Sequence, residues 1–160
     1  MNYQVLLSSS LVDAVFKGSG SSLKDCLDNC FFNIYAGDVP TLAELNGGFS
    51  GRTLIAQICK GDAALTNDLV WDDTTSPGTL MKPSGDTWSA PTDDNVLATG
   101  QPTFFVINVD TADDNSAAAT ATQYRVLGLI GADDTYAIKL GMQTAGDALE
   151  LGSFSLFVIQ

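Results

Sequence analysis

The chain has 160 residues, of which 19 are acidic and seven are basic, and its net charge is −12 at pH 7. This charge argues against nucleic acid as a partner, because phosphate backbones are bound by Lys and Arg, and it also disfavours anionic membrane surfaces. The chain contains no histidine. This absence excludes triad hydrolysis and histidine-based metal sites, so we expect no enzyme activity and no cofactor.

The length predicts a single domain over residues 1–160. Charged residues make up 16% of the chain, against about 25% in an ordinary soluble domain. A surface with so few charges suits burial against other subunits. We find no run of about 20 apolar residues that would suit a membrane span, and no basic region at the start that would indicate a signal peptide.

The first 30 residues predict an extended segment followed by a helical lead-in. Residues 1–7 are apolar and indicate either an edge strand of the domain or an arm that adds a strand to a neighbour's sheet. Residues 8–30 form the lead-in, in which Ser8 to Phe16 has serines for the N-cap and an apolar face. A second helical turn is compatible with residues 23–30.

The rest of the chain predicts strands and turns, with no helical period after residue 30. Residues 37–40 are a turn and residues 41–49 a loop. The expected strands are residues 31–36, 52–59, 69–71, 79–82, 86–90, 103–109, 124–130, 135–140 and 149–158. This pattern predicts an all-β fold, an antiparallel β-sandwich or a jelly-roll-like barrel, with one short N-terminal helix.

Four pairs of adjacent aspartates occur at spacings of 21, 20 and 20 residues, at 72–73, 93–94, 113–114 and 133–134. Asp is favoured in turns, where both side chains of such a pair would point into water. Because every second turn of an antiparallel sheet returns to the same end, the pairs would also suit an acidic rim that binds Ca²⁺. No EF-hand spacing supports this alternative, and we expect no metal site.

The three cysteines, Cys26, Cys30 and Cys59, are expected to be buried or half-buried thiols. Their odd number fits poorly with a purely intramolecular disulfide framework. A disulfide within the chain or between subunits remains the alternative.

Three large side chains have both a structural and a functional interpretation. Trp71 and Trp88 are expected in the core or at an interface, with sugar stacking as the alternative. Arg125 opens an apolar strand and is expected to pair with an Asp of a strand or loop. The functional alternative for Arg125 is a carboxylate of a partner subunit.

Six segments resemble, in order, a pattern found in structural proteins of tailed bacteriophages. They are Phe32-Asn-Ile-Tyr-Ala-Gly-Asp-Val-Pro40, Gly51-Arg-Thr-Leu-Ile-Ala-Gln-Ile58, Gly85-Asp-Thr-Trp88, Thr99-Gly-Gln-Pro-Thr-Phe-Phe105, Tyr124-Arg-Val-Leu-Gly128 and Leu149-Glu-Leu-Gly-Ser-Phe-Ser-Leu156. The resemblance covers roughly residues 10–158. The chain departs from the pattern at Val106, where an arginine is usual, and at Arg52, which interrupts a Gly-Thr-Leu-Leu-Ala segment.

The resemblance implies a virion structural protein, most simply a capsid decoration (cement) protein on the capsid exterior. Its partners would be the major capsid protein and copies of itself, as a dimer or trimer. A head–tail connector or tail component is the second alternative, and a lectin-like binding module is the third. The residues expected at an interface are Asn2, Tyr3, Val5, Leu6, Leu7 and Arg125.

Overall fold

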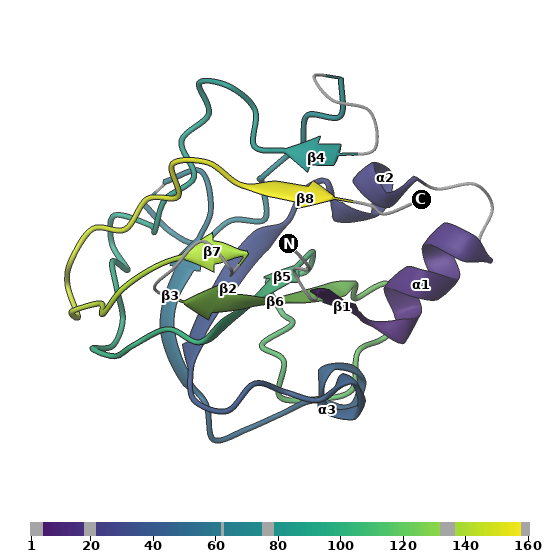
Figure 1. Ribbon diagram of the computed structural model, residues 1–160, viewed down its shortest axis with the longest axis horizontal. Helices are drawn as coiled ribbons and strands as arrows, with labels where there is room; N and C mark the ends of the chain where they lie inside the picture. Colours follow the sequence, from purple (N-terminus) through teal and green to yellow (C-terminus); the bar gives the residue numbers. More distant parts are fainter. Residues whose placement is uncertain (1–4, 18–21, 62, 75–78, 132–136, 158–160) are drawn as a thin grey trace.

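The computed structural model describes residues 5–17, 22–61, 63–74, 79–131 and 137–157. The fold is mainly β (Figure 1). The larger sheet has six strands in the order β1-β6-β5-β2-β3, all antiparallel, with β7 joined to β6 in parallel. Its strands are β1 (Val5–Leu7), β2 (Phe31–Ala36), β3 (Thr53–Ile58), β5 (Phe104–Asn108), β6 (Arg125–Gly131) and β7 (Ile138–Lys139).

A second, two-stranded antiparallel sheet joins β4 (Thr79–Met81) to β8 (Ser155–Phe157). The described strands form no closed barrel, so the barrel alternative is not supported. The all-β expectation is otherwise confirmed at the level of an antiparallel, mainly β fold. The expected strands at 69–71 and 86–90 are only isolated bridges, in which Leu69 pairs with Cys30 and Ser89 pairs with Cys59.

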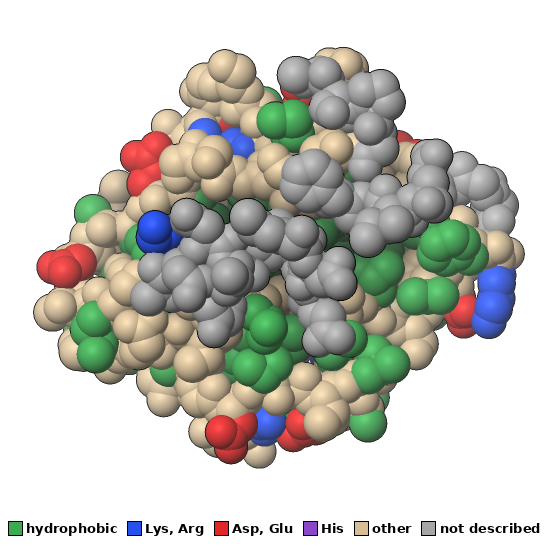
Figure 2. Space-filling view, in the orientation of Figure 1, with side chains coloured by type: hydrophobic (Ala, Val, Ile, Leu, Met, Phe, Trp, Pro, Cys, Tyr) green, Lys and Arg blue, Asp and Glu red, His purple; other side chains and the backbone are tan. Residues whose placement is uncertain are grey.

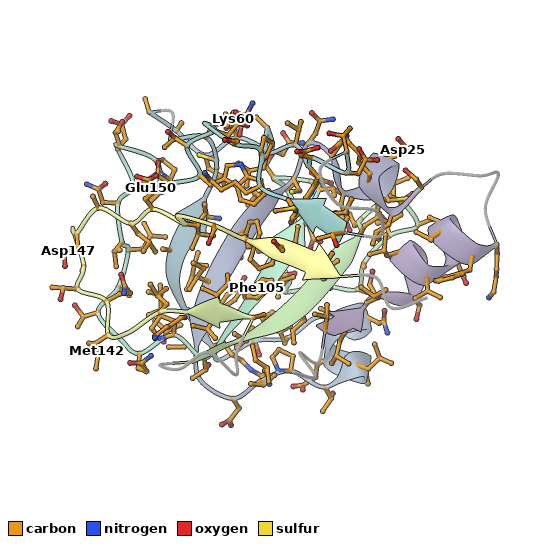
Figure 3. All side chains as sticks on the ribbon, turned by 45° about the horizontal axis from the view of Figure 1, so that its top comes forward. Asp25, Lys60, Phe105, Met142, Asp147 and Glu150 are labelled. Carbon is orange, nitrogen blue, oxygen red and sulfur yellow. The ribbon has the colours of Figure 1, made fainter. Side chains whose placement is uncertain are left out.

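The central strands β2 and β5 are buried on both faces, which is why apolar residues occupy both faces instead of alternating with exposed polar ones, with the buried Asn33 and Asn108 as the polar exceptions. Figure 1 shows β4 and β8 on one side of the larger sheet, and α3 (Leu42–Gly47) on the other. The larger core lies under β4 and β8, where Phe32 packs edge-on against Phe154 with ring centroids 5.2 Å apart. Phe105, labelled inside the molecule in Figure 3, belongs to the same core.

Gly128 of β6 lies directly opposite Phe105 of β5. A Cβ at this glycine would lie 2.3 Å from Cζ of the Phe105 ring. The ring therefore lies across the neighbouring strand, which only a residue without a side chain permits. This contact explains the glycine in the middle of an otherwise apolar strand.

The opposite face of the sheet carries a smaller core of Tyr35, Phe104, Val106 and Leu127, covered by Leu45 and Phe49. Tyr35 and Phe104 stack with centroids 5.1 Å apart. Leu45 comes from α3, which lies in the segment 41–49 that was expected to be a loop. That expectation was wrong: Thr41 and Glu44 form a reciprocal capping box that starts a helix.

The helical lead-in consists of α1 (Ser9–Phe16), capped by Ser8, and α2 (Leu23–Leu27), capped by Ser22. The described residues therefore contain three short helices rather than one. None of the described helices is long and apolar enough to span a bilayer.

Candidate functional site

The most extensive polar arrangement is a row of side chains that crosses four strands on the face of the smaller core. Gln57 of β3 lies opposite Asn33 of β2, and Asn108 of β5 lies opposite Arg125 of β6. Asn33, Asn108 and Arg125 are buried. Because buried polar groups are costly unless they are paired, a row of this kind needs a complete set of hydrogen bonds.

Hydrogen bonds link the row from one strand to the next. The Gln57 amide donates to Asn33 Oδ1 at 2.8 Å, and Asn33 Nδ2 donates to Asn108 Oδ1 at 2.9 Å. Asn108 Nδ2 then donates to Asp113 Oδ2 and to Asn115 Oδ1, both at 2.9 Å. Asp113 and Asn115 belong to the segment after β5, so the row fastens that segment to the sheet.

Arg125 and Asp113 form a buried ion pair. Arg125 Nε donates to Asp113 Oδ2 at 2.8 Å and its Nη2 donates to Asp113 Oδ1 at 2.5 Å. Two further guanidinium hydrogens reach backbone oxygens, with Nη1 donating to Leu45 O at 2.8 Å and Nη2 to Ala117 O at 2.9 Å. One side chain thereby ties α3, the segment 109–124 and β6 together.

This ion pair decides between the two interpretations of Arg125. The arginine pairs with a loop aspartate of its own chain, and its side chain is 1% exposed. The guanidinium contacts that the structure shows all lie within its own chain, and the expected place of Arg125 at an interface stays a prediction. The expectation that adjacent aspartates point into water is also wrong for Asp113, whose side chain is 3% exposed.

Asn115 and Tyr35 complete the network. We call the whole set of linked side chains the polar row; its members are Gln57, Asn33, Tyr35, Asn108, Asp113, Asn115 and Arg125. Asn115 has a positive φ of 64°, a conformation that Asn tolerates better than most residues, and its Nδ2 donates to the Tyr35 hydroxyl at 3.0 Å. Burial raises the pKa of Tyr35 to about 12, although the hydrogen bond from Asn115 opposes this rise. At neutral pH the Tyr35 hydroxyl is therefore protonated. The hydrogen bonds of the polar row link the sheet to the segments that cover it.

The cysteines and tryptophans considered in the sequence analysis all lie in the core. Cys26, Cys30 and Cys59 are buried free thiols, as expected, and burial raises the pKa of the Cys30 thiol. Trp71 and Trp88 are 2% and 0% exposed, which confirms the core interpretation and leaves neither ring available to stack on a sugar.

Asp73, Asp93 and Asp94 are exposed, Asp72 is half-buried and pairs with Met81 in an isolated bridge, and the aspartates at 133–134 lie outside the described residues. Asp72 accepts from the backbone N–H and the hydroxyl of Thr74, in a turn of the kind that Asp favours. Among the described side chains, no group of three or more His, Cys, Asp or Glu residues is arranged to hold a metal ion.

The N-terminal residues that were expected at an interface fall into two groups. Asn2 and Tyr3 lie outside the described residues. Val5, Leu6 and Leu7 form β1, which pairs with β6 at the edge of the larger sheet, so the edge-strand alternative is confirmed for these three residues. Their side chains pack within the domain, Val5 and Leu7 against the larger core and Leu6 against the smaller one.

No protein-family model, no curated protein and no solved structure matches this chain.

Proposed function

We propose that this chain is a bacteriophage virion structural protein, a capsid decoration (cement) protein that binds the outer surface of the expanded shell. What carries the proposal is the position of the six segments that resemble phage structural proteins. Four of them contribute β2, β3, β5 and β6, which are adjacent in the larger sheet, and the last contributes β8 of the smaller sheet. The resemblance therefore follows the framework of the fold rather than scattered loops.

The charge distribution supports a place on the outside of a shell. Figure 2 shows acidic side chains around the margin of the visible face, and the basic side chains at its bottom and right lie beside acidic ones. A surface of this sign repels packed DNA, because it cannot neutralise phosphates. We propose the capsid exterior as its location and the major capsid protein as its partner.

A decoration protein acts through binding free energy and needs no catalytic group. By binding the expanded lattice and not other states of the shell, it stabilises that lattice by mass action. We regard the two sheets, with the larger core between them, as the layers of an antiparallel β-sandwich. A packed sandwich with an internally fixed covering segment suits this role, because a preorganised surface loses little entropy on binding.

The test is to mix the purified protein with expanded shells that lack it and to measure co-sedimentation. A decoration protein saturates in proportion to the capsid subunit and raises the temperature at which the shells disassemble. Saturation at far lower occupancy, confined to one vertex, would instead identify a head–tail connector or tail component. Absence of binding would contradict both roles.

A further inference from the structure

The outer edge of β1 has backbone groups that no other described strand pairs with. Ser8 N donates to Arg125 O at 2.9 Å, so Ser8 and Arg125 are a hydrogen-bonded pair of the antiparallel ladder. Hydrogen-bonded and non-hydrogen-bonded pairs alternate along such a ladder. Leu6, two residues earlier, therefore directs its N–H and C=O toward Leu127 of β6. The N–H and C=O groups of Val5 and Leu7 therefore point away from β6, and among the described residues no strand pairs with them.

This edge is held in a fixed conformation by the residues that follow it. The Ser8 hydroxyl accepts from Arg125 N at 3.0 Å and also caps α1. The side chains of Val5 and Leu7 pack against the larger core. An added strand would therefore meet a preformed template and would be recognised mainly by the backbone of β1.

The charges of the chain indicate the chemistry of such a strand. Each of the seven cations already has a partner. Five are in ion pairs, Lys17 with Asp13, Lys24 with Asp28, Arg52 with Glu44, Lys60 with Asp86 and Arg125 with Asp113. Lys82 donates to Asp86 O, and Lys139 has an interaction of its own. The charge left uncompensated is therefore acidic, and a complementary partner is basic.

We propose that the β1 edge accepts an extended, Lys- or Arg-bearing segment of the shell subunit as an additional strand. This inference rests on the proposed function and specifies its contact. The backbone of Val5 and Leu7 supplies the hydrogen bonds. The negative field of the domain attracts the basic segment and excludes acidic ones.

The decisive variant removes one outward N–H and leaves every side chain in place. Native chemical ligation at Cys26 joins a synthetic segment 1–25 to recombinant residues 26–160, and the synthetic part carries N-methyl-Leu7. Because Leu7 N–H points away from β6, we expect an unchanged melting temperature. Affinity for expanded shells should weaken about tenfold, the effect of losing one well-formed hydrogen bond. N-methyl-Leu6 is the matched control, since its N–H faces β6 and its loss should lower the melting temperature.

A second measurement on the unmodified protein covers the case in which methylation disturbs folding. Amide hydrogen exchange over residues 5–7 should slow when the protein is bound to shells, and binding should weaken as NaCl rises from about 0.05 to about 0.5 M. Unchanged exchange, or binding independent of salt, would overturn the inference.

The outcomes separate this inference from the proposed function. If the ligated but unmethylated protein does not bind shells, both are overturned. If it binds and N-methyl-Leu7 binds equally well, only the strand addition is overturned. If N-methyl-Leu7 abolishes self-association and leaves shell binding intact, the edge joins copies of this chain and the inference again fails.

Discussion

Arg125 connects three parts of the molecule through one side chain. From β6, its guanidinium contacts the Leu45 carbonyl in α3, and both Asp113 and the Ala117 carbonyl in the segment 109–124. A buried ion pair is weak evidence for stability in itself, because desolvation offsets much of the attraction. We expect its effect here to be specificity, because its contacts favour one placement of the segment 109–124 on the sheet.

Replacing Arg125 by Met should therefore be strongly destabilising. The change leaves the Asp113 carboxylate buried without its cation, and the Leu45 and Ala117 carbonyls lose their donors. We expect the free energy of unfolding to fall by about 3–5 kcal/mol, measured by urea denaturation at neutral pH.

The matched control is Lys17→Met, which removes an exposed ion pair with Asp13. Surface pairs of this kind contribute about 0–1 kcal/mol, so this variant should unfold close to the wild type. A loss for Arg125→Met no larger than that for Lys17→Met would contradict the role given to the buried pair.

Titration of Tyr35 should make the free energy of unfolding depend on pH in the alkaline range. Its pKa is raised from 10.0 to about 12, mainly by burial, so the folded state disfavours the phenolate. Above pH 10 the unfolded chain loses this proton while the folded chain keeps it. The free energy of unfolding should therefore fall between about pH 10 and 12, with a slope from this group of up to about 1.4 kcal/mol per unit.

The Tyr35→Phe variant isolates this contribution from that of the buried Cys30 thiol, whose pKa is also raised by burial. Below pH 10 the variant should lose a constant amount of about 1 kcal/mol, because Asn115 Nδ2 loses its hydroxyl partner. Between pH 10 and 12 its stability should fall less steeply than that of the wild type. Parallel curves across that range would show that Tyr35 does not carry the effect.

At the scale of the elements, the end of α3 touches the segment that the polar row holds. Gly48 has a φ of 93°, and a Cβ there would lie 2.7 Å from backbone atoms of Ser116 and Ala117. Gly48→Ala should therefore destabilise the protein by about 2 kcal/mol or more in urea denaturation, from strain and backbone overlap together.

Gly47→Ala provides the comparison at the neighbouring position. A Cβ at Gly47 meets nothing within 4 Å, and this residue lies inside α3 with no positive φ. Replacing glycine by alanine in a helix stabilises by about 0.5–1 kcal/mol. The two variants should thus change stability in opposite directions, and a stabilising Gly48→Ala would disprove the close approach.

The strands were largely predictable from the sequence, because apolar runs between turn residues specify them locally. The expected strand at 31–36 coincides with β2, and that at 103–109 contains β5. By contrast, α3 was missed because its six residues show no helical period and end in glycines. Thr41 and Glu44, at the spacing of a capping box, were the signal that could have identified it.

Apart from the pairing of Arg125 with a loop aspartate, the polar row could not be predicted, because its contacts join residues far apart in the sequence. Leu45 and Arg125 are 80 positions apart, as are Tyr35 and Asn115. The available signal was a polar residue inside an apolar strand, Asn33, and another at the end of one, Asn108. That signal indicates a buried network, but only the three-dimensional register shows which loop completes it.

At the scale of the whole molecule, repulsion within the excess of acidic charge lowers the stability of the fold. The acids labelled in Figure 3, Asp25, Asp147 and Glu150, lie at the periphery, where their repulsion is reduced only by solvent and salt. Within the part of the chain that the structure describes, the buried charges cancel, because the buried cation Arg125 is matched by Asp113. The excess charge therefore acts through the surface, where it disfavours the folded monomer and favours a basic partner.

Salt should consequently act in opposite directions on folding and on binding. Raising NaCl from about 0.05 to about 0.5 M screens the repulsion among surface acids. The melting temperature of the free protein should therefore rise, by about 2–4 °C if the gain in the free energy of unfolding is roughly 1 kcal/mol.

The double variant Asp147→Asn, Glu150→Gln carries two fewer negative charges. It should melt higher at low salt and respond less to added NaCl, whereas the same NaCl should weaken the proposed attachment of the wild type to shells. A melting temperature that falls with added salt would mean that the surface ion pairs, rather than the net charge, dominate the electrostatics of the fold.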